Sequence, residues 1–476
     1  MKAFVAYMRG QEICKTDSKK GECAFPYVGV VEFRPLNDGK GGAARRMVFL
    51  EPKFFKDDKT SAGTEGEFSK GQEIVLKAIL KYCKKQRASL FSSGQLTGAA
   101  GDTTQLSRYL ALVLDVMENG IYQVPRSEFR VNGPGNISWE ATFARMEPTF
   151  LPEGPAYVDF ITRETDYDDD CYISRLQSFL AATCLRRLND MGLAGPFGLH
   201  LEDPFVNCSL DEFGPEDYII ARIRAELNVQ FIDVKRNSLK LMLSVLEESE
   251  SLMADRLEFQ SFGMSGFHSL WEVAIKEVLR DDLDKTPRAL GLDHVEKEKA
   301  DVPLWQFVDP PVWVKSDSTE EALPVEDEGD RLEPDFVAAR VGLEDGETFV
   351  ILDAKYYVPE FVDNQILRQP GVGDVDKQLL YQLAYTPLAK KMRNAFIFPE
   401  HMEPAMGQEG TLRSRHFATI KVPVFGLGGL PMEFDSYMVD GLALLEKYVY
   451  SVCDDDERSL LKGILGPKTE TVPATA

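Results

Sequence analysis

Apolar residues recur at helical spacing in several stretches of the first half of the chain. Between Leu106 and Val116 they repeat every three or four residues, which places them on one face of a helix. The same spacing predicts further helices at 72–87, 173–188, 218–227 and 237–246. Short apolar runs between polar or glycine-rich stretches predict strands at 27–33, 47–50, 137–142 and 156–161. Residues 1–250 are therefore predicted to form an α+β region.

The composition shifts over residues 247–261, and we place a domain boundary at residue 250. Beyond it, Glu344-Asp345-Gly346 is typical of a hairpin turn between two predicted strands. The acidic, proline-containing stretch 309–331 predicts a surface loop. The elements predicted in this half are helices at 268–279, 374–392 and 439–450, and strands at 335–341, 348–357, 395–398 and 417–425. Residues 251–476 are therefore predicted to form an α/β domain.

Two carboxylates and one ammonium are predicted to meet on the first two strands of this domain. Asp353 and Lys355 lie two residues apart, so their side chains point to the same face, and the hairpin brings Asp335 beside them. Phosphodiester cleavage needs an activated water and a way to neutralise negative charge on the phosphate. A hard cation such as Mg²⁺ supplies both and prefers carboxylate oxygens. The pattern favours a metal-dependent nuclease, in which Asp335 and Asp353 bind the cation and Lys355 stabilises charge.

An Asp-x-Lys sequence alone is weak support, because a surface ion pair on a hairpin has the same spacing. Here it follows the very apolar run Phe349-Val-Ile-Leu, which indicates a central strand rather than an edge strand. Charged residues at the end of a buried strand are unusual without a functional reason. The nuclease interpretation is therefore favoured over a solvated hairpin.

The helix after the second strand adds polar candidates. Gln378, Tyr381, Gln382 and Tyr385 fall on one helical face, and we take Gln378 and Tyr381 as candidate catalytic residues that hydrogen-bond the lysine, a phosphate or a water. Packing in the core is the alternative for the tyrosines. Glu272, on the helix at 268–279, is a third candidate metal ligand; the alternative is a solvent-exposed helical glutamate, which has the same spacing.

Charge and composition limit the function further. The chain of 476 residues carries a net charge of −23, which opposes strong binding to duplex DNA unless basic residues converge or a partner delivers the DNA. The 7 cysteines form no C-x-x-C pair, and no phosphate-binding loop motif occurs. The start of the chain lacks the apolar core of a signal peptide, and no apolar run is long enough to span a bilayer, so we expect a cytoplasmic location.

The nuclease motif resembles a known superfamily. Glu333-Pro-Asp, Asp353-Ala-Lys-Tyr-Tyr and the segment 369–385 are similar to the PD-(D/E)XK nucleases, and within them to the LlaJI-type restriction endonucleases, which are related to the McrC subunit. Leu50-Glu-Pro-Lys-Phe and Asn132-Gly-Pro-Gly-Asn-Ile-Ser-Trp-Glu-Ala-Thr are similar to the N-terminal region of that family. The resemblance covers most of the chain.

The resemblance implies a C-terminal PD-(D/E)XK core, with a mixed central sheet flanked by helices, and an N-terminal α+β region that docks on a partner. It implies a Mg²⁺-dependent DNA endonuclease subunit of a restriction (phage-defence) system, with Mn²⁺ as a substitute ion. The implied partners are double-stranded DNA and a McrB-like AAA+ GTPase or ATPase, without a membrane, and with dimerisation for double-strand cutting. The absence of a Walker motif from this chain agrees with that division of labour.

Two alternatives stay open at the level of sequence. One is a stand-alone repair-type nuclease of the same superfamily, which would degrade DNA without a partner. The other is a non-catalytic assembly or activator subunit of the AAA+ motor. Intact Asp335, Asp353 and Lys355 argue against the second alternative.

Overall fold

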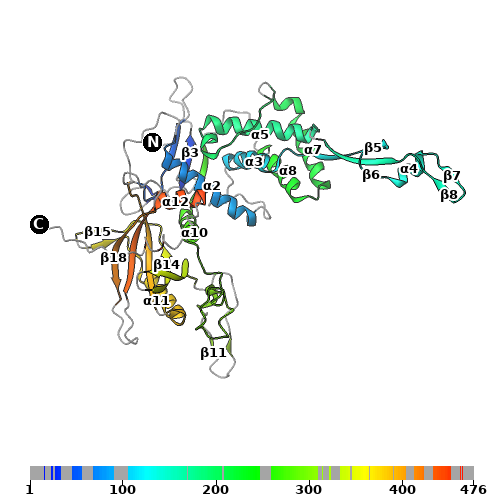
Figure 1. Ribbon diagram of the computed structural model, residues 1–476. Helices are drawn as coiled ribbons and strands as arrows, with labels where there is room; N and C mark the ends of the chain where they lie inside the picture. The colour runs from blue at the N-terminus through cyan, green and yellow to red at the C-terminus, as the bar shows by residue number, and fades with distance from the viewer. Residues whose placement is uncertain are drawn as a thin grey trace, which may run out of the picture.

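The computed structural model has a mixed α/β architecture with a projecting arm (Figure 1). The structure describes residues 15–16, 23–24, 27–33, 46–55, 68–90, 105–168, 170–205, 208–246, 259–308, 313–314, 321–322, 333–343, 346–363, 365–389, 391–403, 412–422, 433–451, 461 and 464. Among these residues, no helix is both long and apolar enough to cross a bilayer.

A five-stranded mixed sheet organises the second half of the chain. Its order is β13-β14-β17-β19-β18, in which β14, β17 and β19 run parallel and the two outer strands run antiparallel to their neighbours. The strands are β13 (Phe336–Leu343), β14 (Gly346–Ala354), β17 (Met392–Glu400), β18 (Ser414–Lys421) and β19 (Glu433–Asp440). β14 is thus a central strand, as its apolar sequence predicted.

Helices cover both faces of this sheet. Alternate residues of β14 divide between two cores, with Val350 and Leu352 in one and Phe349 and Ile351 in the other. The first core includes α10 (Phe267–Leu279) and α12 (Gly441–Tyr450), and the second includes α11 (Val372–Tyr385). The smaller elements nearby are η2 (Leu304–Gln306), η3 (Thr386–Leu388), and the strand pairs β11 (Trp313–Val314) with β12 (Glu321–Ala322) and β15 (Glu360–Val362) with β16 (Gln365–Leu367).

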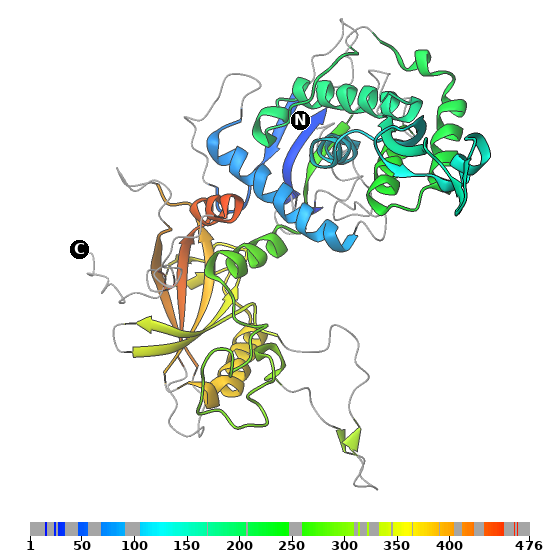
Figure 2. The same cartoon turned by 45° about the vertical axis from the view of Figure 1, so that its right-hand side comes forward.

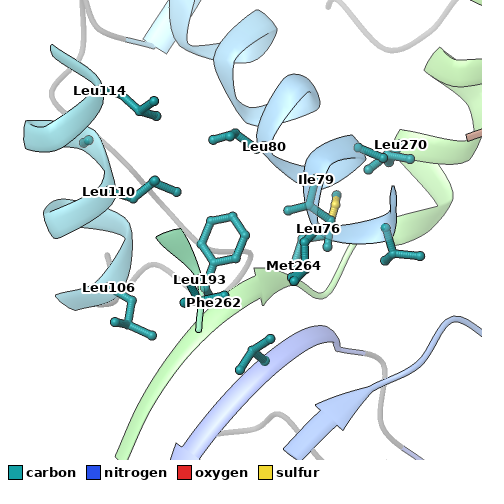
Figure 3. Close-up of a cluster of buried hydrophobic side chains, with 14 of the residues drawn as sticks. Leu76, Ile79, Leu80, Leu106, Leu110, Leu114, Leu193, Phe262, Met264 and Leu270 are labelled. Atoms are coloured by element: carbon teal, nitrogen blue, oxygen red, sulfur yellow. The ribbon is translucent and has the colours of Figure 1, made fainter. Parts of the chain in front are cut away.

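The first half of the chain, together with β10, builds a separate three-stranded sheet, β10-β3-β4, packed against helices. Gly29 of β3 and Gly263 of β10 face each other, and an added Cβ on either would lie 2.2 Å from a backbone oxygen, so only glycine permits this pairing. The labelled side chains of α2, α3 and β10 point toward one another in Figure 3. These elements are β3 (Val28–Phe33), β4 (Arg46–Leu50), β10 (Phe259–Met264), α2 (Lys70–Leu90), α3 (Gln105–Asn119), α5 (Tyr172–Asp190), α6 (Ala194–Phe197), η1 (Leu210–Phe213), α7 (Glu216–Val229) and α8 (Asp233–Leu246); the short pair β1 (Lys15–Thr16) and β2 (Cys23–Ala24) precedes them.

A ribbon of strands projects from this core as an arm, which we define as residues 124–168 (Figure 1). It comprises β5 (Val124–Val131), β6 (Asn136–Ile137), α4 (Trp139–Arg145), β7 (Thr149–Leu151), β8 (Gly154–Ala156) and β9 (Ile161–Asp168). Its root is anchored at Tyr122, whose hydroxyl donates to Glu226 at 2.7 Å and accepts from Gln230 at 2.8 Å. The arm is thus attached firmly at its base.

The two halves meet where α2 lies against α10 and α12 (Figure 2). The Lys81 ammonium of α2 contacts the Glu277 carboxylate of α10, and it donates to the Tyr448 carbonyl of α12 at 2.5 Å. The segment Glu51–Phe55 also reaches across, because Phe54 packs 6.3 Å from Trp271 between ring centroids. The 250/251 boundary stays a prediction, and β10, which follows it in sequence, pairs with β3.

Most predicted elements are present, with some corrections. The predicted strand at 137–142 is wrong beyond Ile137, because α4 begins at Trp139. The predicted helix at 374–392 ends as α11 at Tyr385, where η3 and Pro387 follow. β19 was not predicted, and it includes Val439 and Asp440, which were assigned to the last helix. The predicted turn residues Glu344 and Asp345 lie outside the described residues, as does the stretch 309–331 apart from the β11–β12 pair.

Candidate active site at the carboxyl end of β14

Asp353 and Lys355 lie at the carboxyl end of β14, with Lys355 just beyond the last strand residue. The Lys355 Nζ is 2.8 Å from Asp353 Oδ1, so the predicted common direction of these side chains is confirmed. Asp353 is almost fully buried, at 5% exposure. A buried charge of this kind requires a partner. The carboxylate and the ammonium therefore form one unit inside the protein.

Asp335 joins this unit across the strand pair. It precedes β13 by one residue, rather than lying on the strand as predicted. The antiparallel register pairs Phe336 with Leu352, so continuing it by one residue brings Asp335 opposite Asp353. The Ala354 backbone N–H donates to Asp335 Oδ2 at 2.7 Å, which fixes this carboxylate at the end of β14.

The acidic groups influence one another's ionisation. Burial, followed by repulsion from Asp353 and, more weakly, Glu272, raises the pKa of Asp335 to about 7, despite the opposing Ala354 hydrogen bond. Burial also raises the pKa of Glu272, with a further contribution from Asp353. Glu272 of α10 therefore lies within electrostatic range of Asp353 and Asp335. Near neutral pH, these carboxyl groups retain a proton more readily than isolated ones would.

Asp374 is a site residue that the sequence analysis did not identify. It lies in the first turn of α11, and its Oδ1 accepts a hydrogen bond from Lys355 Nζ at 2.9 Å. Its other oxygen accepts from the Gly371 N–H at 3.0 Å, which caps the start of the helix. Burial favours the neutral amine of Lys355, but Asp353 and Asp374 outweigh it and raise the pKa of that lysine. Lys355 is thus held as a cation between two carboxylates.

The two tyrosines on the polar face of α11 make different contacts. The Tyr381 hydroxyl donates to the Glu333 carbonyl at 2.9 Å and so holds the segment that leads into Asp335. Burial and the nearby carboxylates Asp353 and Asp335 raise the pKa of Tyr381 to about 12, so it remains a donor. Tyr385 is fully buried and donates to the Leu304 carbonyl at 2.8 Å, which is a core contact.

Gln378 is fully buried on α11 beside β17. Its backbone carbonyl accepts from Asn394 Nδ2 at 2.9 Å, while neither polar atom of its own side chain has a hydrogen-bond partner among the described residues. An unpaired buried amide is costly. Its catalytic role stays a prediction, as do those of the other candidate residues.

Within the described part of the chain, no three histidine, cysteine or acidic side chains are arranged as a ready metal site. Asp335 and Asp353 nevertheless lie opposite each other at the end of β14, and Glu272 lies within electrostatic range of both. Burial and mutual repulsion of these carboxyl groups raise the pKa of Asp335, a situation that a bound cation would relieve. Chemically, the cluster can bind a cation and present an ammonium beside it.

Comparison with known proteins places this site in context. The family model of the LlaJI restriction endonuclease matches residues 39–421, which include every candidate site residue. A component of a type II restriction enzyme from Bacillus subtilis (strain 168), BsuMI component YdjA, is 26% identical over 406 residues, covering 83% of this chain and 76% of that protein.

One solved structure is similar to this chain: a refined half-complex from a tetradecameric assembly of Thermococcus gammatolerans McrB AAA+ hexamers with bound McrC. The match covers 93% of this chain and 83% of the matched chain in that structure. Its sequence identity is 14% and its TM-score is 0.34, and a likeness this low supports no inference. The family match extends over most of the sequence, from β4 to β18. The chain therefore belongs to the LlaJI restriction endonuclease family.

Proposed function

We propose that this chain is the DNA-cleaving subunit of a multi-component restriction system and hydrolyses phosphodiester bonds with a divalent cation. The observation that carries the proposal is the meeting of Asp335, Asp353 and Lys355 at the end of a central strand. The mixed sheet, its flanking helices and the two acids beside a lysine support our assignment of a PD-(D/E)XK core. Family membership supports a nuclease.

The donors fit a hard cation such as Mg²⁺, with Mn²⁺ as a substitute. Asp335 Oδ2 accepts from Ala354 and Asp353 Oδ1 faces Lys355, so each carboxylate keeps one oxygen for a metal. Mg²⁺ needs only one or two protein carboxylates when water and substrate phosphate complete its shell. Glu272 would bind through a water or directly. When bound, the cation would supply an activated water and neutralise phosphate charge.

The protein's own groups would then act on the phosphate. Lys355, fixed between Asp353 and Asp374, would place a positive charge where negative charge develops in the transition state. Its two carboxylate partners keep it from rotating away, which saves the cost of ordering it during the reaction. Tyr381 would hold the Asp335 segment in position through Glu333. Asp335 would lose its proton as the cation binds.

A partner for DNA delivery would dock on the first half of the chain. The arm exposes many large apolar side chains to solvent, among them Phe150 at 79% and Val158 at 73%. Exposed apolar surface on this scale is typical of a protein interface. The related BsuMI protein is itself described as a component of an enzyme. An AAA+ GTPase or ATPase bound there would supply the DNA affinity that a chain with a net charge of −23 lacks.

Plasmid cleavage tests the proposal. The purified chain is incubated with Mg²⁺, alone and with a McrB-like AAA+ nucleotidase from the same organism, with GTP or with ATP. We expect cutting only with partner and nucleotide, and none with Asp353→Asn. Cutting by the chain alone would support a stand-alone nuclease instead. Wild-type protein that stimulates the partner's nucleotidase but never cuts would support a non-catalytic activator.

A further inference from the structure

Lys53 belongs to the N-terminal half of the chain, yet it lies at the end of the proposed catalytic strand. Its backbone N–H donates to the Tyr356 hydroxyl at 3.1 Å, and its Nζ is 5.3 Å from the centroid of the Tyr356 ring. Tyr356 directly follows Lys355. A lysine from one half of the molecule thus contacts the residue that follows Lys355 in the other half.

The position of Lys53 does not depend on its own side chain. Phe54, at 2% exposure, packs against Trp271, and it lies so close to Gly441 that a Cβ there would approach its ring to 2.7 Å. Tyr356 is held in turn by the Phe267 ring, at 5.2 Å between centroids. These contacts and the Lys53 backbone hydrogen bond would survive replacement of the lysine side chain.

The ammonium of Lys53 differs from those of two other lysines near the five-stranded sheet. Lys276 pairs with Glu333 at 3.6 Å, and Lys421 pairs with Glu433 at 3.4 Å. Lys53 is exposed, and within the described ranges no carboxylate lies at ion-pair distance from its ammonium. Its described contact is the face of Tyr356. In so acidic a chain, this ammonium remains available to an anion.

We propose that Lys53 binds a backbone phosphate of the DNA strand being cut. This inference rests on the proposed nuclease function. Consecutive side chains of an extended segment point to opposite sides, so Lys355 and Tyr356 lie on either side of the end of β14. Lys355 faces Asp374 on one side, and Lys53 covers Tyr356 on the other. A DNA strand that crosses the end of β14 would contact both Lys355 and Lys53. The two halves of the chain would then each contribute one lysine to the DNA-binding site.

DNA binding and cleavage by the full chain test this assignment. Lys53→Met and Lys53→Arg are compared with wild type and with Lys421→Met, which removes a 78%-exposed lysine far along the sheet. Binding of a short duplex to the chain in complex with its partner and a non-hydrolysable nucleotide is measured by fluorescence anisotropy with Ca²⁺ in place of Mg²⁺, over a range of salt concentrations. Cleavage is measured with Mg²⁺, partner and nucleotide.

We expect Lys53→Met to weaken duplex binding and to raise KM by roughly tenfold. The slope of log Kd against log salt concentration should fall by about one, which corresponds to the loss of one phosphate contact. Lys53→Arg should stay near wild type, and so should Lys421→Met. If wild type cuts and Lys53→Met matches it in KM and salt slope, the inference is overturned while the nuclease proposal stands. DNA binding that depends on Lys53 without any cutting would refute the nuclease and keep the contact. A complex of chain, partner and nucleotide that neither binds nor cuts DNA overturns both.

Discussion

The end of β14 buries charged side chains, whereas the tip of the arm exposes apolar side chains to solvent. At the end of β14, Asp353 is buried and Lys355 has two fixed carboxylate partners. On the arm, Phe150 and Leu151 point into solvent from a short strand pair with little core beneath it. The first arrangement fixes charged atoms to within hydrogen-bond distances, as chemistry requires. The second offers apolar area without internal partners, as association requires.

The largest expected effect is a loss of cleavage when Lys355 or Asp353 is substituted at the end of β14. Lys355→Met and Asp353→Asn keep the approximate volume of each side chain, and we expect each to lower the cleavage rate by at least ~1000-fold, because the charge that acts on the phosphate is lost. Partner binding should be unchanged. Rates are measured by single-turnover plasmid cleavage in the reconstituted complex.

The exposed pair Arg288–Asp301 supplies a control for these variants. Its atoms lie 2.7 Å apart and both side chains are more than half exposed, so Asp301→Asn should cleave like wild type. Thermal unfolding checks that each variant is folded. A Lys355→Met protein that cuts at a tenth of the wild-type rate or faster would remove the lysine from the reaction.

The opposite result is expected on the arm. Phe150→Ser combined with Val158→Ser removes two side chains that are 79% and 73% exposed. The loss should raise the Kd for the AAA+ partner by roughly ten- to a hundredfold, since a few apolar anchors carry most interface energy. The unfolding temperature should not fall, because neither side chain is buried. Surface plasmon resonance measures the association and dissociation of the partner.

Val372→Ser is the matched control for partner binding, because Val372 is also 79% exposed but lies on α11. It should leave partner affinity unchanged. Equal losses for the arm variant and for Val372→Ser would mean that exposed apolar surface in general, and not the arm, determines docking.

A smaller effect concerns pH and belongs to the buried site alone. The pKa of Asp335 is raised to about 7, so below this pH a cation must displace a proton to bind. Mg²⁺ affinity should therefore fall about tenfold per unit as pH drops below 7, and level off above it. Calorimetric titration in buffers of different ionisation enthalpy would also detect proton release. Asp335→Asn should show no such slope, whereas partner binding by the arm should not follow this titration.

The sequence predicted the centre of this site because the signal was local. Asp353 and Lys355 follow a run that is apolar on both faces, and the hairpin places Asp335 opposite them. Asp374 could not be identified in this way, because its contact with Lys355 depends on how α11 packs against the sheet. An acidic residue in the first turn of a helix normally serves the helix itself, and Asp374 does this as well.

The missed elements have physical explanations of the same kind. β19 has Asp435, Ser436 and Asp440 among its buried residues, so its sequence lacks the continuous apolar character of a buried strand. α4 is short, and in it the Thr142 N–H donates to the Ser138 carbonyl at 2.8 Å. The alternation of Ile137, Ser138 and Trp139 imitated a strand, although Ser138 is a typical residue to precede a helix. The local sequence pattern did not predict these elements, because tertiary contacts bury polar residues that would otherwise be expected at the surface.

The smallest predicted effect distinguishes positioning from chemistry inside the buried site. Tyr381→Phe removes only the hydrogen bond to the Glu333 carbonyl, 2.9 Å long, and keeps the ring in the core. A neutral hydrogen bond is worth about 1 kcal/mol, so we expect roughly a fivefold lower cleavage rate and a slightly lower unfolding temperature. Because the bond holds the Asp335 segment, the loss should be partly recovered at high Mg²⁺ concentration. A Tyr381→Phe loss as large as that of Lys355→Met, and insensitive to Mg²⁺, would instead place the hydroxyl on the reacting phosphate. The size of this effect thus decides whether α11 supports the acids of β14 or takes part in the reaction beside them.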